Sequence, residues 1–248
     1  MKKIFLFIFL CVSLLLAHGP NYNLAEAAKK RGDYNGAIKY TLKQLSTDID
    51  TYGDDAKEII ISYSKLGYYY EKIGAYEEAL KYSFKAITVQ KKCTEKEDKT
   101  IASTYNNIGG IYSKLKQYEN SLKYYFMSLE IQKAIFGENY RASAITYNNL
   151  ARVYRKLEEY PKALEYYSKT LEIRVETLGK EHYSTALTHS NIGLVYFELG
   201  RYGEALKELN KTLIIRKKIF GVEHSITKKT QKNIEYVKKE MMKKSKKK

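Results

Sequence analysis

The chain of 248 residues is 44% hydrophobic and 29% charged, with a formal net charge of +16. These fractions are typical of a soluble folded protein and exclude a disordered or membrane-embedded chain. Two prolines in the whole length argue against a loop-rich or all-β architecture. Cys93 is the single cysteine outside the N-terminal leader, which excludes an internal disulfide in the mature chain.

The N-terminus has the form of a secretory signal. Residues 1–19 carry two lysines followed by an unbroken apolar run from Ile4 to Ala17. That run is shorter than the ~20 residues that span a bilayer, and it matches the core of a signal peptide. We therefore predict that residues 1–19 are a signal peptide, of the short form typical of bacteria. The protein would then be exported, either periplasmic or secreted. Membrane anchoring by an uncleaved leader stays open as an alternative.

An internal repeat of 42 residues dominates the rest of the chain. Aligned at this shift, the copies place like residues in the same columns, without insertion. The clearest columns are Leu66, Ile108, Leu150, Ile192; Gly67, Gly109, Ala151, Gly193; Tyr70, Tyr112, Tyr154, Tyr196; and Ala79, Ser121, Ala163, Ala205. A fixed period of this length is the signature of a repeat architecture, in which each copy stacks on its neighbours.

Each copy has the pattern of two helices. Tyr105, Ile108 and Tyr112 recur at helical spacing on one face, and Ser121 and Tyr125 begin a second such face. Glycines after the second helix, at 53, 137, 179 and 221, suit a left-handed helix cap. The sequence thus predicts an all-α fold, an α-solenoid of stacked helical hairpins.

The predicted array occupies residues 20–242. Its repeats fall at about 20–55, 56–97, 98–139, 140–181 and 182–223, followed by a capping helix at 225–242 and a basic tail at 243–248. From Lys228 to Lys248 there are ten lysines against two glutamates, so about half of the excess charge lies at this end.

The combination of a small residue, two tyrosines and an Ala-Leu pair on paired helices resembles the tetratricopeptide repeat. The strings YNNIGGIY, YNNLARVY and SNIGLVYFELG, with GKEH (179–182) and GVEH (221–224), are similar to the kinesin-light-chain subtype. Its usual proline after the histidine is replaced by Tyr183 and Ser225. The resemblance covers about residues 21–242. It implies a right-handed superhelix whose first helices line a concave groove, and a role in binding peptides or protein surfaces.

Asparagines recur on the first helices at the column where the resembled family has ligand-facing asparagines. The column contains Asn23, Asn107, Asn149, Asn191 and Asn233, with Lys65 as the exception, and Asn106 and Asn148 double it. An amide both donates to and accepts from a peptide backbone, so these residues are candidate groove contacts. The alternative is that the amides bond neighbouring helices or face water.

Charged and apolar residues adjoin this column. Arg152, Arg155 and Lys156, with Lys114 from the copy before, predict a groove that prefers an acidic stretch. Leu194 and Phe197 replace them in the next copy and predict an apolar anchor. A solvated basic face, with Phe197 covered by the following helix, is the alternative.

No catalytic or cofactor pattern is present in the sequence. His182 and His224 are equivalent loop residues in successive copies and are too far apart for one metal ion, so we interpret them as loop hydrogen-bonding groups. His189 stands where other copies have tyrosine, which indicates a core position. We expect no metal, no cofactor and no enzymatic activity.

The sequence therefore predicts an exported, non-enzymatic scaffold that binds a protein or peptide partner. The alternative function is a membrane-surface or nucleic-acid-associated factor that acts through its lysine-rich tail. Nucleic acid is the less favoured partner, because no aromatic residue is interleaved with the terminal lysines to stack on bases.

Overall fold

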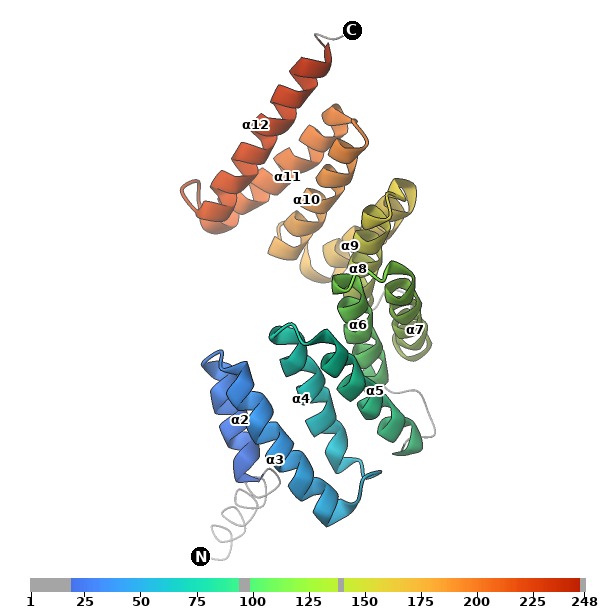
Figure 1. The fold of residues 1–248 in the computed structure, drawn as a ribbon. Helices are drawn as coiled ribbons and strands as arrows, with labels where there is room; N and C mark the ends of the chain where they lie inside the picture. Colours follow the sequence, from blue (N-terminus) through green and yellow to red (C-terminus); the bar gives the residue numbers. More distant parts are fainter. Residues whose placement is uncertain (1–18, 94–98, 138–140, 246–248) are drawn as a thin grey trace, which may run out of the picture. The chain divides into compact units, whose positions relative to one another are not determined.

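The computed structural model describes residues 19–93, 99–137 and 141–245, which form eleven helices and no strand (Figure 1). The predicted signal peptide lies almost wholly outside these residues. Two compact units divide the chain, residues 1–117 and residues 118–248. Unit 1 contains α2 (Pro20–Lys30), α3 (Tyr34–Tyr52), α4 (Glu58–Lys72), α5 (Tyr76–Cys93) and α6 (Lys99–Lys114). Unit 2 contains α7 (Tyr118–Phe136), α8 (Ser143–Lys156), α9 (Tyr160–Leu178), α10 (Tyr183–Glu198), α11 (Tyr202–Phe220) and α12 (Ser225–Ser245).

The ends of the helices follow from the residues that the sequence places there. Asp33 caps α3 by accepting a hydrogen bond from the Gly36 amide at 2.8 Å. Gly53 and Gly179 end α3 and α9 with φ of 89° and 91°, a region that residues with a side chain rarely adopt. The predicted glycine ends of these second helices are confirmed with positive φ, but ψ of 166° at Gly53 and 160° at Gly179 places them in an extended region open mainly to glycine rather than in the left-handed helical cap that was predicted.

In unit 1, each helix packs against the next, from α2 to α6. Its core includes Leu66 and Tyr69 of α4, both almost fully buried between α3 and α5. A Cβ atom added at Gly67 would lie 2.6 Å from the Ser83 hydroxyl of α5. The predicted small column thus sets how closely α4 and α5 approach.

In unit 2, α7 to α12 pack in the same consecutive way. Equivalent tyrosine pairs have the same geometry in both units. In unit 2, Tyr154 stacks on Tyr166 at 5.4 Å between ring centroids and 2° between planes. Tyr70 and Tyr82 show the same 5.4 Å and 2° in unit 1. The recurring tyrosines therefore pack the two helices of a copy against each other.

The last helix is longer than predicted. α12 ends at Ser245 rather than at residue 242, with Lys243 and Lys244 in its last turn. Lysines there are favourable, because the carbonyl groups at the C-terminal end of a helix carry partial negative charge. Its Ile234 and Val237 are buried against α11. Among the described residues, no helix combines the length and hydropathy needed to cross a membrane.

Candidate functional site

The predicted groove residues lie on three first helices. Asn106, Asn107 and Lys114 belong to α6 in unit 1. Asn148, Asn149, Arg152, Arg155 and Lys156 belong to α8, and Asn191 and Leu194 to α10, both in unit 2. The structure therefore describes two separate groups of candidates, one in each unit.

The asparagines differ from one another in their surroundings. Asn191 donates from Nδ2 to Oδ1 of Asn148 at 3.3 Å, which links α10 to α8. Asn106 and Asn149 also interact with other residues of the fold, whereas Asn107 is exposed. The alternative that these amides bond neighbouring helices holds for Asn148 and Asn191.

Two of the four predicted cationic contacts are ion-paired. Lys114 Nζ lies 2.7 Å from Glu71 Oε1 of α4, and Arg155 Nη1 lies 2.7 Å from Glu198 Oε1 of α10. Each pair joins a residue to one that is 43 positions away, so the pairs bridge adjacent first helices. Arg152 is exposed on α8 and has no ion pair in the described part of the chain.

Lys156 is likewise exposed, with no ion pair among the described residues. The predicted basic cluster of four residues is therefore smaller than the sequence suggested. Arg152 and Lys156 are the members whose charge the described fold leaves uncompensated.

A pocket of about 290 Å³ lies between α10 and α12. Asn191 and Leu194 of α10 line one side, and their equivalents 42 residues further, Asn233 and Tyr236 of α12, line the other. Ser190, Gly193, Phe197, Leu209 and Val237 complete its lining. The lining thus combines two amides with apolar side chains, on the face predicted to bind a partner.

Phe197 forms part of the wall of this pocket rather than an exposed anchor. Its ring centroid lies 5.7 Å from that of Tyr202 and 5.6 Å from that of Tyr236, so α11 and α12 both contact it. Leu194 is 39% exposed and remains accessible. Of the two predicted apolar contacts, Leu194 is accessible to a partner, whereas Phe197 is covered by the following helices.

A second pocket, of about 540 Å³, lies in unit 1 and was not anticipated from the sequence. Lys29, Lys57, Lys65 and Tyr68 are among its lining residues. Lys65 stands in the asparagine column, and its Nζ lies 2.5 Å from Glu26 Oε1. The signal that could have located this pocket was the exception of Lys65 in an otherwise regular column.

A recurring polar contact between successive copies was also missed. In four of the five copies, one residue of the second helix bonds a hydroxyl of the next first helix, fourteen positions on. The pairs are Asp48–Ser62 at 3.3 Å, Gln132–Thr146 at 3.1 Å, Arg174–Thr188 at 2.8 Å and Arg216–Thr230 at 2.8 Å. In the second copy Gln90 bonds Thr100 instead. The 42-residue period identifies this column, but not the partner of each member.

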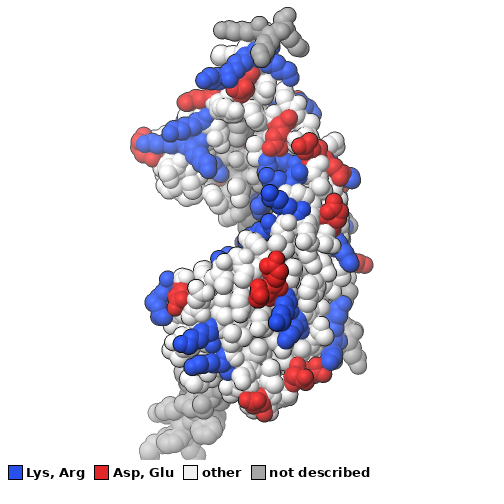
Figure 2. Space-filling view, viewed as in Figure 1, with Lys and Arg blue, Asp and Glu red and all other residues white. Residues whose placement is uncertain are grey.

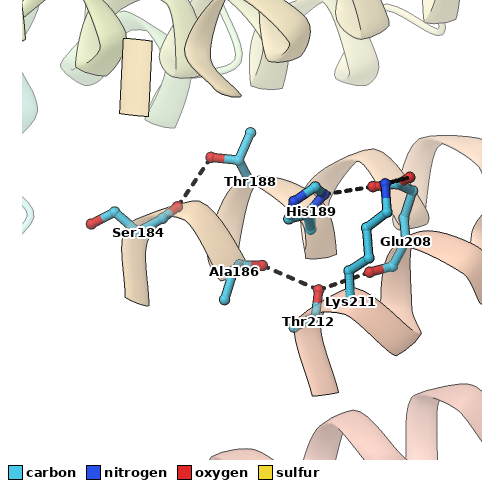
Figure 3. A network of polar contacts seen from close by, with 7 residues as sticks. All are labelled: Ser184, Ala186, Thr188, His189, Glu208, Lys211 and Thr212. Carbon is cyan, nitrogen blue, oxygen red and sulfur yellow. Dashed lines mark hydrogen bonds and ion pairs between the residues drawn. The ribbon is translucent and has the colours of Figure 1, made fainter. Parts of the chain in front are cut away.

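The histidines have structural contacts. His182 and His224 accept hydrogen bonds through Nδ1 from the amides of Ser184 and Ile226, at 3.0 and 3.2 Å, which confirms their interpretation as loop hydrogen-bonding groups. His189 Nδ1 lies 2.6 Å from Glu208 Oε2 (Figure 3).

Glu208 of α11 contacts one side chain of α10 and one of its own helix. Its carboxylate contacts His189 and also Lys211 Nζ at 2.8 Å (Figure 3). Burial disfavours its ionisation, but the hydrogen bonds with His189 and Lys211 outweigh burial and lower the pKa of Glu208 below its ordinary value. Among the residues that the structure describes, no group of three or more His, Cys, Asp or Glu side chains is arranged to hold a metal ion.

Together these features define a helical-hairpin repeat protein with a pocket on its first helices. A family model described as tetratricopeptide repeat matches residues 17–92, 100–176 and 143–218. The chain belongs to the tetratricopeptide repeat family, as the sequence pattern predicted. None of the curated protein sequences compared with the chain matches it.

Solved structures share the fold. A putative kinesin light chain from Podosopora anserina, with nearly identical repeats, is 19% identical, with 80% of this chain and 93% of that chain covered and a TM-score of 0.70. BtubC (BKLC) from P. vanneervenii is 18% identical, with 89% and 84% covered and a TM-score of 0.68. The MamA protein is 22% identical, with 83% and 94% covered and a TM-score of 0.57. The structural neighbours thus include kinesin-light-chain-like repeat proteins.

Proposed function

We propose that this protein is a non-enzymatic scaffold that binds an extended segment of another protein on the first helices of unit 2. The pocket between α10 and α12 would hold one apolar side chain of that segment. The observation that carries the proposal is the pairing of Asn191 with Asn233 and of Leu194 with Tyr236 around one cavity. Membership of a family of protein-interaction scaffolds that are generally non-catalytic supports it.

The lining suits a peptide chemically. Asn233 is exposed and Asn191 retains acceptor capacity beside its bond to Asn148, so both amides can meet the donors and acceptors of a peptide backbone. Leu194 and Tyr236 offer apolar surface to a side chain between them. A pocket with apolar walls and a few polar groups at its rim is the usual form of a binding site.

Magnitudes show what else the complex needs. A micromolar complex requires about 8 kcal/mol. Two or three hydrogen bonds at ~1 kcal/mol each and one buried leucine-sized side chain at roughly 2–3 kcal/mol supply about two-thirds of it. Arg152 and Lys156 of α8 are uncompensated and would favour acidic residues in the rest of the segment.

Export is part of this proposal. The leader at residues 1–19, with its two lysines and apolar run, supports it. The partner would then be a protein of the bacterial envelope or of the secreted fraction.

Photo-crosslinking tests the proposal. A photoreactive amino acid placed at Leu194 should crosslink to a partner from envelope or secreted extracts. The same group at Ile214, which is 67% exposed on the second helix α11, should not. Leu194→Asp should abolish the crosslinked complex in pull-downs, whereas Ile214→Asp should leave it intact. Crosslinking from Ile214 alone, or equal capture by both Asp variants at unchanged helicity, contradicts the assignment.

A further inference from the structure

The two faces of α12 have opposite character. Thr227, Thr230, Ile234 and Val237 are buried against the rest of unit 2 at spacings of three and four residues. A second row, offset by two positions, has the same spacing and is exposed along its whole length. This row consists of Lys229, Lys232, Tyr236, Lys239 and Lys243, which we call the lysine stripe. At 1.5 Å per residue it extends for about 21 Å.

The charge of the lysine stripe is mostly uncompensated. Lys243 Nζ lies 2.7 Å from Glu240 Oε1, but Lys229, Lys232 and Lys239 have no ion pair within the described residues. α12 carries seven lysines and two glutamates in all. Figure 2 shows blue side chains at the end of unit 2 where α12 lies.

Apolar groups accompany these lysines. The Tyr236 side chain lies at the middle of the stripe and is 56% exposed, and Met242 is 63% exposed. Met242 follows Lys239 by three residues, so the two are neighbours on the helix surface. Lysines with an exposed tyrosine and methionine suit the boundary between lipid headgroups and acyl chains, where an aromatic ring can keep its hydroxyl in water.

We propose that the lysine stripe of α12 binds the surface of a membrane that contains anionic lipids. The contact is peripheral, because the lysines bind headgroups and only Tyr236 and Met242 offer apolar surface to the interface. This goes beyond the binding of a protein segment in the pocket, and it assigns the lipid contact to a folded helix rather than to residues 246–248.

Two features favour lipid over nucleic acid. The Tyr236 ring already contacts Phe197 at 5.6 Å between centroids, and it is the only aromatic residue of α12, so α12 offers no series of rings for bases to stack on. A phosphate backbone would also leave the exposed Met242 in water. An anionic bilayer accommodates both the lysines and the methionine.

Vesicle binding of the full chain provides the test. The probes are vesicles of phosphatidylglycerol mixed with phosphatidylcholine, and vesicles of phosphatidylcholine alone, which measure any binding by the apolar leader. The test variant is Lys229→Gln/Lys232→Gln/Lys239→Gln. The matched control is Lys30→Gln/Lys39→Gln/Lys43→Gln, which removes the same charge from exposed lysines of α2 and α3. A Lys→Arg triple variant at the stripe keeps the charge.

Each lysine near an anionic surface contributes about fivefold to binding, so the stripe variant should bind anionic vesicles about 100-fold more weakly. The control variant should lose less than about fivefold, since its lysines belong to helices other than the one that binds the surface, and the arginine variant should bind as the unmodified chain does. An equal loss in the stripe and control variants would show that net charge alone matters and would overturn the proposal. So would a stripe variant that binds anionic vesicles normally while losing binding to duplex DNA. Circular dichroism checks that all variants keep their helicity.

Discussion

Arg216 donates from Nη1 to the hydroxyl of Thr230 at 2.8 Å, which joins α11 to α12. The arginine is 8% exposed, and its Nε is buried without a hydrogen-bond partner. Burial lowers the pKa of Arg216, because the charged form loses its hydration. The equivalent residues of the second and third copies are Gln90 and Gln132.

Arg216→Gln should therefore leave the protein as stable or stabilise it by up to about 1 kcal/mol, since a buried charge without an acidic partner is replaced by a neutral amide. Urea unfolding followed by circular dichroism measures the change. Thr230→Val removes the acceptor and keeps the arginine, so it should destabilise by about 1–2 kcal/mol. A large loss of stability in Arg216→Gln would show that the guanidinium makes a favourable contact beyond Thr230.

The sequence predicted the fold because the repeat signal depends on local spacing. Gly67 and Leu66 mark the same face of a helix in every copy, and the structure places them against the next helix. Side-chain pairing is different, because it depends on the register between neighbouring helices. Arg155 and Glu198 pair across one copy plus one residue, a relationship that no column of the repeat displays. The sequence therefore indicated the face of the candidate site but not which of its charges were already paired.

The pocket between α10 and α12 was half predicted for the same reason. The asparagine column placed Asn191 and Asn233 on one face, and Leu194 was recognised as an apolar candidate. Tyr236 was missed, because the repeat pattern gave α12 only a capping role. Tyr236 lines the pocket because α12 packs beside α10. That packing follows from the tertiary contacts between α12 and α11.

The lowered pKa of Glu208 predicts a loss of stability in acid. A carboxylate whose pKa is lower in the folded state than its unfolded value of 4.5 stabilises the fold above that value. This contribution is lost as the pH falls through the folded pKa. Glu208→Gln should thus destabilise the protein by about 1.5–3 kcal/mol at neutral pH, and by much less in strong acid, where the wild-type carboxylate is protonated too. Thermal unfolding of both proteins across this pH range measures the difference.

Lys211→Met provides a second variant for the same network. It removes one hydrogen bond to the Glu208 carboxylate and leaves His189 in place. In Lys211→Met, the stability lost on acidification should be smaller than in the wild type but not zero. A difference between wild type and Glu208→Gln that stays constant with pH would contradict the role assigned to ionised Glu208.

The close packing of α10 against α11 predicts that a larger side chain at Gly193 destabilises unit 2. A Cβ atom at this position would lie 3.1 Å from Leu209 Cγ and 3.3 Å from the Ala205 carbonyl oxygen. Gly193→Leu should destabilise by about 1–3 kcal/mol, because α10 and α11 must move apart. Gly203 is the matched control, since it lies in α11 with no atom near its Cβ direction. Gly203→Ala should stabilise by up to about 1 kcal/mol through helix propensity, and comparable losses in the two variants would exclude packing as the cause.

The Arg155–Glu198 pair should couple α8 to α10. Its side chains are 17% and 29% exposed, so solvent screens the pair only in part. A double-mutant cycle with Arg155→Met and Glu198→Gln should give a coupling free energy of about 1 kcal/mol, measured by urea unfolding. The coupling should weaken in high salt, since screening acts on partly exposed charges. Glu198→Gln alone should release Arg155 and raise the affinity for an acidic peptide, so an unchanged affinity would place the acidic residues of the partner away from α8.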